Sequence, residues 1–406
     1  MHDTTSVIVV GAGVVGATTA YELARRGASV TLLDKAPDLG GGCSYANAGV
    51  LAPDHVGPLA TRSLLAEGAK QMFMSPPAVR VNPSAGLLPW LGRLVGSTGG
   101  RRVMLSTARL QELAHRSAEL HRRFAEEGHS PTYRHTGALE VHLERGGDGA
   151  GLSSAEARAL VPTLGDVAGA RLSPNEAVVE SRSYARSMLE LAREHGAEAR
   201  FGADVRGLVA RGGRVVGVRV DGEELHAEHV VLATGLATTS LAASAGVRVP
   251  LRGGRGYVVD LDVDDAPSLP VRLKERRIVV TPFADRLRVC GLMELGAEGR
   301  PLDPRRPEAM VEVVSDALPG TRIRGVIDTW VGERPCAADG VPVIGSSGVA
   351  EGLTVAAGHG MWGLVLAPVT AEMVATGLLE GAPTLHEALL SPDRFGSLRH
   401  RVALAA

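Results

Sequence analysis

The chain has 406 residues, 45% of them hydrophobic and 22% charged, so it is long enough for two globular domains with a substantial core. Its 43 basic and 45 acidic residues give a formal net charge of −2, which offers no electrostatic reason to expect nucleic-acid binding. The cysteines, at positions 43, 290 and 336, are too few for a disulfide scaffold and lack metal-ligand spacing, so we expect no metal site.

The N-terminal residues show no signal-peptide pattern, so we expect a reducing, cytoplasmic location and leave open a peripheral contact with the inner face of the cell membrane. The longest weakly polar segment, 230–247, contains threonine, serine and two internal glycines. We predict a buried strand and a helix there, and no transmembrane segment.

The first predicted elements are a strand, a helix and a second strand. Val7–Val10 is a short apolar run, typical of a buried parallel strand, and apolar residues recur at helical spacing from Val14 to Ala24. Gly27 suits the end of that helix, and a second apolar run, Val30–Leu33, follows it. This order predicts a βαβ unit.

The middle of the chain has a different pattern. Proline and glycine are scattered through 53–100, and 104–127 has the periodicity of an amphipathic helix. Further strands are predicted at 138–144, 203–210, 214–220 and 229–235. After Pro250 the segments GYVVDLDV, RIVVTPF and RLRVCGL alternate like antiparallel strands, and the last elements are a strand at 353–357 and an apolar helix at 364–379.

A glycine-rich turn joins the first strand to the first helix. Gly11, Gly13 and Gly16 form the pattern G-x-G-x-x-G, in which the glycines permit a tight turn, close approach to a pyrophosphate and close packing of helix on strand. The helix N-terminus, with Val14 and Val15, then faces the phosphates. Asp34 ends the second strand, where a carboxylate can accept hydrogen bonds from a ribose. The unit therefore predicts a dinucleotide site.

Two later segments favour FAD over NAD. Thr234-Gly235 ends a predicted buried strand, in the manner of a second glycine signature. Gly358, Gly360 and Gly363 form a glycine turn before the last helix, whose N-terminal N–H groups would stabilise negative charge on a reduced flavin.

Strands and helices of the βαβ kind occur at both ends and in the middle, separated by antiparallel segments. We predict an α/β fold with a Rossmann-like FAD-binding domain formed by residues 1–55, 150–245 and 326–395. An inserted α+β substrate domain, built on a mixed or antiparallel sheet, would comprise residues 56–149 and 246–325.

Together these segments resemble the D-amino-acid oxidase superfamily, and are most similar to the bacterial D-amino-acid dehydrogenase small-subunit type. The matching stretches are VVGAGVVGATTAYELARRG, SYANAG at 44–49, TPFADRLRVCGLMELG, WVGERPCAADGVPVIG and GHGMWG. The resemblance implies noncovalent FAD and hydride transfer from the Cα of an amino acid, of D configuration, to flavin N5. The product would be an imino acid that hydrolyses to a 2-oxo acid.

The resemblance also implies a set of cofactor-binding residues along the whole chain. They are Gly11, Gly13, Val14, Val15, Gly16, Asp34, Lys35, Ser44, Asn47, Ala48, Gly49, Val205, Thr234, Gly235, Gly358, His359, Gly360, Met361 and Gly363. Within this set Asn47, Ala48 and Gly49 would lie along the isoalloxazine ring, and Gly358 to Gly363 would lie at its pyrimidine edge.

Two residues are candidates for binding a substrate carboxylate. Arg334 matches the arginine that performs this role in the superfamily, and a guanidinium can hold a carboxylate by two parallel hydrogen bonds. Its structural alternative is an ion pair with Asp339. Tyr257 matches a tyrosine that would donate to the same carboxylate, and its alternative is a core tyrosine with a satisfied hydroxyl.

Four further residues are substrate-pocket candidates. His55 stands where the related dehydrogenases have an aromatic segment, and Trp362 stands where they have a smaller residue. Met293 and Glu294 match a strand facing the pocket, although an ion pair with a neighbouring arginine is the alternative for Glu294. Ala46 occupies the position at which covalent relatives carry histidine, which favours noncovalent FAD.

The implied partners are an amino-acid substrate and an electron acceptor, either a quinone or oxygen. Two other functions remain open. One is a glycine- or sarcosine-type oxidase, or an enzyme that forms an imine on a cyclic amino acid. The other is a flavoprotein subunit with no turnover of its own.

Overall fold

A computed structural model describes residues 4–39, 42–73, 77–84, 86–144 and 151–396. Its first sheet has six strands in the order β19-β20-β13-β1-β2-β9. All neighbouring pairs are parallel except β19 and β20. The strands are β1 Ser6–Val10, β2 Ser29–Asp34, β9 Glu198–Phe201, β13 His229–Leu232, β19 Val343–Ser346 and β20 Leu353–Ala357. This sheet confirms the predicted βαβ opening.

The six-stranded sheet is covered on both faces. Alternate residues of β1 enter two separate cores, Val7 and Val9 in one and Ile8 and Val10 in the other, as the period of a strand requires. The first core is completed by helices α1 Val14–Ala24, α4 Gly100–Glu126, α6 Ser181–Glu194 and α9 Gly363–Leu379. The second is completed by α7 Thr238–Ser244 and by a three-stranded sheet of β10 Val205–Arg211, β11 Arg214–Val220 and β12 Glu223–His226.

A second large sheet has eight strands in the order β18-β14-β17-β16-β15-β6-β7, with β4 also paired to β17. Most pairs are antiparallel, as the alternating segments after Pro250 predict. The strands are β4 Val79–Val81, β6 Ala138–His142, β7 Gly169–Ser173, β14 Leu251–Asp264, β15 Val271–Leu273, β16 Ile278–Pro282, β17 Leu287–Leu295 and β18 Arg322–Ala337.

The two faces of this larger sheet differ. On β14, Tyr257, Val259 and Leu261 pack into a core with α8 Arg305–Ala317 and α5 Ser154–Leu160. Val258 points to the opposite face, where it packs against Ala46. A small third sheet is formed by segments of the chain that lie between strands of the two large sheets. Its strands are β3 Val50–Leu51, β8 Ala177–Val178 and β5 Arg134–His135, and the one-turn helix η1 Pro53–His55 follows β3.

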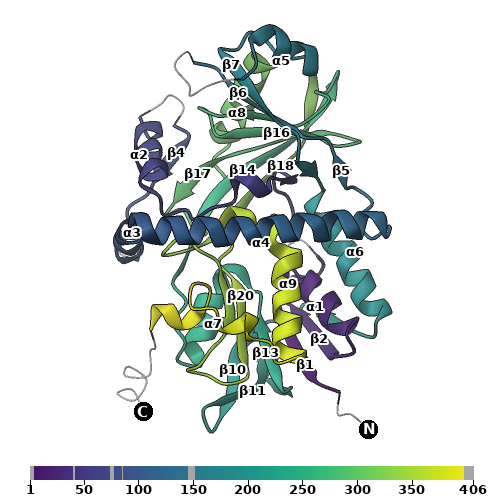
Figure 1. Cartoon of the computed structure of the whole chain (residues 1–406), viewed down its shortest axis with the longest axis vertical. Coiled ribbons are helices and arrows are strands. Elements are labelled where there is room, and N and C mark those ends of the chain that lie inside the picture. The colour runs from purple at the N-terminus through teal and green to yellow at the C-terminus, as the bar shows by residue number, and fades with distance from the viewer. Residues whose placement is uncertain (1–3, 40–41, 74–76, 85, 145–150, 397–406) are drawn as a thin grey trace.

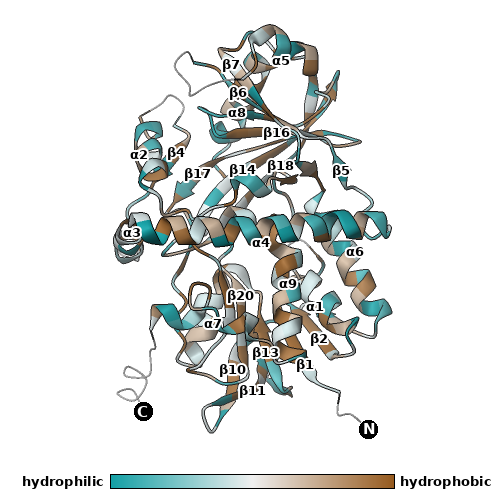
Figure 2. Cartoon of the chain, in the orientation of Figure 1, coloured by the Kyte–Doolittle hydropathy of each residue, from teal (hydrophilic) through white to brown (hydrophobic). Residues whose placement is uncertain are grey.

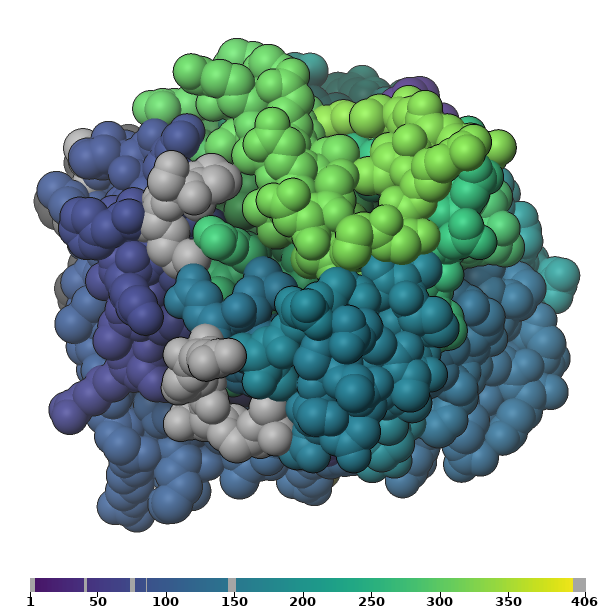
Figure 3. Space-filling view, turned by 90° about the horizontal axis from the view of Figure 1, so that it is seen from above, coloured from purple at the N-terminus to yellow at the C-terminus, as the bar shows by residue number. Residues whose placement is uncertain are grey.

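The two large sheets occupy opposite ends of the molecule, and the long helix α4 runs across the middle (Figure 1). Helices α2 Arg62–Gln71 and α3 Leu87–Gly96 lie beside one end of α4. Seen from the end that carries the eight-stranded sheet, the teal segments before residue 175 lie directly against the green segments after residue 250 (Figure 3). The α/β fold with a Rossmann-like domain and a second domain of mixed sheet is therefore confirmed.

Strand pairing places two segments differently from the predicted domain limits. Residues 169–173 pair with β6, and residues 322–337 pair with β14, so both belong to the eight-stranded sheet. The prediction had counted most of these residues with the FAD-binding domain. The remaining domain limits stay a prediction.

One segment of the described residues, Gly360–Leu379, is long and apolar enough to cross a membrane, with a mean hydropathy of 1.5. It is mostly buried inside the fold, because α9 packs against α1 and α4. In Figure 2 α9 is mostly apolar along its length, whereas α4 alternates between polar and apolar residues. A helix that is apolar all round and buried in this way is typical of the core of a globular domain. The predicted strand and helix within 230–247 are also present, as β13 and α7.

Candidate functional site

The first glycine turn is as tight as its sequence predicts. Gly11 has φ = 102°, and a Cβ on it would stand 2.5 Å from the carbonyl oxygen of Ala233. A Cβ on Gly16 would overlap the carbonyl oxygen of Gly11. Both positions therefore require glycine, because the backbones of β1, α1 and the end of β13 meet there.

The start of α1 is suited to a phosphate. Its N-cap residue, Gly13, has no side chain to cap the helix, and the first turn contains no acidic residue. The Val14 N–H donates to Ser44 Oγ at 3.0 Å, which places a hydroxyl beside the helix N-terminus. N–H groups at a helix N-terminus and an adjacent hydroxyl are the donor set that phosphate oxygens accept.

Asp34 is fixed at the end of β2 by the backbone. Its Oδ2 accepts from the Ala12 N–H at 2.6 Å and its Oδ1 from the Ala36 N–H at 2.8 Å. Each oxygen keeps further lone pairs, so the carboxylate can still accept from ribose hydroxyls. The Ala203 N–H donates to the Asp34 carbonyl, which brings the start of β10, with Val205, to the same end of the sheet. Lys35 is exposed beside it.

The second glycine signature lies against the first. Gly235 has φ = 55°, and the Cα of Thr234 lies 3.2 Å from the place of a Cβ on Gly11. Thr234 Oγ1 is hydrogen-bonded to Thr238 Oγ1 at 2.9 Å, which holds the turn at the start of the next helix. The ends of β1, β2 and β13 thus form one site, and its residues fit a dinucleotide.

The segment SYANAG, residues 44–49, runs from this site to the eight-stranded sheet. Thr281 Oγ1 donates to the carbonyl of Ala48 at 2.7 Å, and Ala46 packs with Val258 and Cys290. Gly49 has φ = 67°, and a Cβ there would stand 2.7 Å from Phe283. Gly49 therefore cannot be replaced by a larger residue unless Phe283 moves.

Asn47 is used within the strip itself. Its Oδ1 accepts from the Gly49 N–H at 2.8 Å, so its amide oxygen holds the turn, while its NH₂ group and the second lone pair of Oδ1 are left for a ring edge.

Arg334 lies on the face of the eight-stranded sheet that SYANAG covers. Its guanidinium lies across Gly256, where a Cβ would clash with it, and Nη1 donates to the carbonyl of Leu292 at 3.1 Å. Cys290, which packs against Ala46, is 4.0 Å from Nη2. Among the residues that the structure describes, no carboxylate lies within ion-pair distance of Arg334.

The structural alternative for Arg334 is wrong. Asp339, its expected partner in that alternative, is instead bound by Arg102 at 2.7 Å and by Arg394 at 2.8 Å. The Arg334 guanidinium, which is partly buried, therefore remains available to a carboxylate from outside the chain.

Tyr257 and Glu294 do not face this site. Tyr257 donates its hydroxyl to Glu294 Oε2 at 3.1 Å, and burial raises the pKa of the phenol. Glu294 is buried and also pairs with Arg306 at 3.1 Å and Arg80 at 3.5 Å. Both residues lie on the α8 side of the sheet, opposite Arg334. The expected contact of either residue with a substrate carboxylate or amine is corrected: they form a core hydrogen bond and ion pairs.

Met293 does face the site, since its Sδ lies 2.8 Å from the place of a Cβ on Gly254, which pairs with Arg334.

His55 does not face the site. Its Nε2 is 3.2 Å from Glu176 and 3.3 Å from Arg272 of β15, and burial lowers its pKa. Strand β15 is four steps from β18 in the sheet, about 19 Å at the usual strand spacing. The expected substrate contact of His55 is therefore not supported.

The second glycine turn of the site precedes α9. Gly358 and Gly360 have φ = 72° and 57°, and the one-turn helix η3 Gly360–Trp362 leads into α9. The His359 ring turns inward and bonds to Thr370 Oγ1 at 3.0 Å, and burial lowers its pKa to about 4. His359 therefore contributes its backbone to the turn, while its neutral side chain anchors α9.

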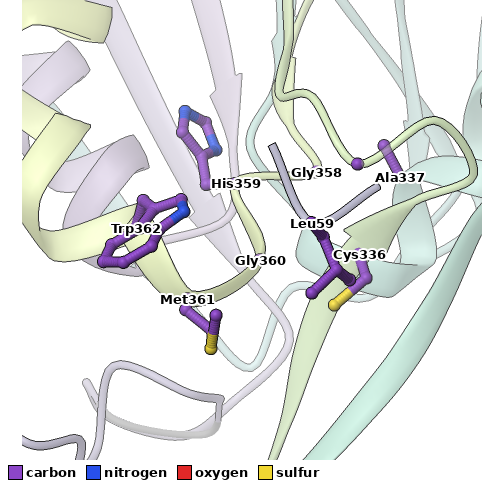
Figure 4. A pocket seen from close by; sticks show the side chains of 9 residues that line it. Leu59, Cys336, Ala337, Gly358, His359, Gly360, Met361 and Trp362 are labelled. Atoms are coloured by element: carbon purple, nitrogen blue, oxygen red, sulfur yellow. The ribbon is translucent and has the colours of Figure 1, made fainter. Parts of the chain in front are cut away.

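A narrow cavity lies beside this turn, between residues 358–362 and the end of β18 (Figure 4). Cys336 and Leu59 lie on one side, and Trp362 turns toward the helices on the other. Trp362 Nε1 donates to the carbonyl of Gly57 at 2.9 Å, which fixes the position of the indole. Met361 is the exposed side chain of the turn, at 40%.

Sequence reasoning missed Gly256 and the carbonyl of Leu292, which position the Arg334 guanidinium. An isolated glycine inside a predicted strand is a signal of close approach and could have indicated Gly256. The carbonyl of Leu292 depends on an irregularity in β17, where Leu292 has φ = 62°, and no sequence signal shows it.

Several solved structures share this fold. A glycine oxidase from Bacillus cereus ATCC 14579 has a similar structure, with a TM-score of 0.73 and 19% identity over 97% of this chain and 98% of that chain. An L-proline dehydrogenase from P. horikoshii gives a TM-score of 0.72 and 18% identity over 97% and 98%. An L-α-glycerophosphate oxidase from Mycoplasma pneumoniae with FAD bound gives a TM-score of 0.64 and 16% identity, over 93% of this chain and 95% of that chain.

The family model described as DAO, FAD dependent oxidoreductase, matches residues 6–376. That range includes both glycine turns, SYANAG and Arg334. The chain therefore belongs to the DAO family of FAD-dependent oxidoreductases.

Proposed function

We propose that this protein oxidises the carbon–nitrogen bond of an amino acid, of D configuration, to an imino acid that hydrolyses to a 2-oxo acid and ammonia. The observation that supports this most is Arg334, a guanidinium with no acidic partner among the described residues, next to the strip that connects it to the dinucleotide site. The fold alone would not decide, because one similar structure is named an oxidase of α-glycerophosphate.

Arg334 would bind the substrate carboxylate. Leu292 accepts one of its N–H groups and Gly256 supports the plane of the guanidinium, so the remaining donors keep a fixed direction. Charge-assisted hydrogen bonds contribute about 1.5–3 kcal/mol each, enough to orient a small substrate. Met293 and the backbone of Gly254 would border the same pocket.

Bound FAD would supply the two-electron acceptor for the hydride that leaves the substrate Cα. Ser44, the N-terminus of α1 and Asp34 would hold its phosphates and ribose. Noncovalent attachment is part of this proposal: burial raises the pKa of Cys336 to about 11, so this thiol near the turn is not a reactive thiolate.

No side-chain base is needed for this oxidation. The neutral amine of the substrate has a lone pair that can assist the departure of hydride, and His359 is already bonded to Thr370. The contribution of the protein would therefore be positioning of the substrate and exclusion of water.

An anaerobic screen tests the proposal. The FAD-loaded protein is mixed with D- and L-amino acids, glycine, sarcosine, cyclic amino acids and L-α-glycerophosphate, and bleaching of the flavin absorption band is recorded. We expect D-amino acids to bleach the flavin band. We expect the Arg334→Ala variant to need far higher concentrations of the same amino acid for the same bleaching. Bleaching by L-α-glycerophosphate alone, or by no compound, would contradict the proposal, and the second result would favour a subunit without turnover.

A second candidate is oxidation of glycine, sarcosine or a cyclic amino acid. It is favoured by the likeness to structures named glycine oxidase and L-proline dehydrogenase. The same screen separates the two candidates. Oxygen consumption under air, compared with reduction of a quinone, then identifies the electron acceptor. The cytoplasmic location stays a prediction.

A further inference from the structure

A second cavity lies where α3, α7 and the start of β14 meet. Its volume is about 680 Å³, within the range of small-molecule pockets. Much of its wall is apolar, with Pro89 and Trp90 from α3 and Leu236, Pro250 and Leu251 from the other side. None of these residues belongs to the FAD or carboxylate sites described above.

The charged groups of this cavity are mostly positive. Arg93, Arg248 and Arg252 line it together with one carboxylate, Glu298, which accepts from the Gly253 N–H at 3.2 Å. Across the described part of the chain, none of these three arginines forms an ion pair. The neighbouring Arg102 and Arg394, by contrast, both pair with Asp339.

Two of the three guanidinium groups are partly removed from water. Arg93 is half-buried, with its Cζ 5.0 Å from the ring centroid of Phe395, and Arg252 is half-buried against Gly86. Arg248 is exposed at the rim. Partly buried positive groups without an acidic partner favour the binding of an anion, since the anion replaces the solvation that they have lost.

The cavity is connected to the strand that carries Arg334. In the β14–β18 ladder Arg252 pairs with Cys336, and Gly254, two residues on, pairs with Arg334. Trp90 lines the cavity and donates from Nε1 to the carbonyl of Cys336 at 3.2 Å. Both residues are buried, so they form a wall between the two sites.

We propose that this cavity is a second ligand site, for an organic anion that carries a carboxylate or a phosphate on an apolar or aromatic body. The arginines would bind the anionic group, and Trp90 and the leucines would contact the body. The proposal does not depend on the proposed function, because it concerns a different set of residues.

The test is isothermal titration calorimetry of the FAD-loaded protein with phenyl phosphate and with phenylacetate, which separate a phosphate ligand from a carboxylate ligand. Benzyl alcohol serves as the uncharged control. We expect at least one of the two anions to bind, with affinity that falls as salt is added, and benzyl alcohol to bind at least tenfold more weakly.

Three variants locate the binding. Arg248→Ala with Arg252→Ala should weaken binding at least tenfold, because each guanidinium supplies charge-assisted hydrogen bonds. Arg206→Ala, whose side chain is 80% exposed outside the cavity, should leave it unchanged, and Arg334→Ala should remove only the binding that occurs at the substrate site. If the double variant does not fold, Arg248→Gln alone provides the test, since its exposed side chain leaves the packing intact.

Absence of binding at millimolar concentration would overturn the proposal, as would equal binding of benzyl alcohol. Loss of binding in Arg334→Ala with retention in the arginine double variant would place the anion at the substrate site and overturn it too. Failure of the amino-acid screen would leave these outcomes unaffected, so the two proposals fail separately.

Discussion

Gly256→Ala tests the position of Arg334 without removing its charge. The guanidinium of Arg334 lies where the new Cβ would stand, and three of its atoms would clash with that carbon. A normal contact between such atoms is about 3.5 Å, so the guanidinium must move by about 1 Å. A misplacement of that size costs about 100-fold in rate, equivalent to about 2.7 kcal/mol.

We therefore expect Gly256→Ala to lower kcat/KM by about 100-fold while the protein still binds FAD. The matched control is Gly325→Ala on β18, since a Cβ there meets nothing within 4 Å. The assay is steady-state oxidation of the best substrate from the screen, with flavin content measured on the same samples.

The reasoning also predicts a coupling between the two positions. In an Arg334→Ala background the guanidinium is absent, so Gly256→Ala should cost little more. If Gly256→Ala were as active as Gly325→Ala while Arg334→Ala was strongly impaired, the guanidinium would not lie over Gly256 in the working enzyme, and the argument would be refuted.

Four other changes follow from the site. Ala48→Leu should weaken or displace FAD, measured as flavin retained on purification. Ser44→Ala should lower FAD affinity about fivefold in a fluorescence titration, because the phosphate would lose the hydroxyl donor that stands beside the Val14 N–H. Tyr257→Phe should leave KM unchanged and reduce the free energy of unfolding by about 1–2 kcal/mol, since Glu294 loses a buried donor; a raised KM would restore Tyr257 to the substrate site. The pKa of His359 is lowered to about 4, so its contribution to stability is complete above about pH 6.5 and falls by about 1.4 kcal/mol per pH unit toward pH 4. Urea unfolding at pH 7 and pH 5 should show a smaller loss for His359→Asn than for the unmodified protein.

The dinucleotide half of the site could be predicted because its signals are local. Gly11 and Gly16 are required by backbone contacts within one strand–turn–helix unit, and Asp34 follows at the end of the next strand. The substrate half depends on which face of a sheet each residue occupies. Tyr257 is one residue from Gly256 in sequence, yet it points to the opposite face. Side chains alternate along a strand. An alignment with the family that is shifted by one residue therefore assigns a side chain to the wrong face of the sheet.

The irregularity in β17 makes this half harder still to predict. The register of the β14–β17 pair changes between Arg255 and Tyr257, and Leu292 on β17 adopts a positive φ. This places Met293 on the Arg334 face and Glu294 on the other, where it pairs with Arg306. A β-bulge is set by tertiary packing, and no residue pattern in the segment reveals it.

The arrangement of charge explains why Arg334 can serve a substrate. Glu294 is held on the far face by Tyr257 and Arg306, and Asp339 is held by Arg102 and Arg394. Each of these carboxylates already has a partner that is closer than Arg334, so none can neutralise it without leaving a buried arginine unpaired, at a cost of about 3–5 kcal/mol. A substrate carboxylate faces no such competition. Substituting Arg306 or Arg394 would therefore reduce stability before it changed substrate binding, whereas substituting Arg334 should do the reverse.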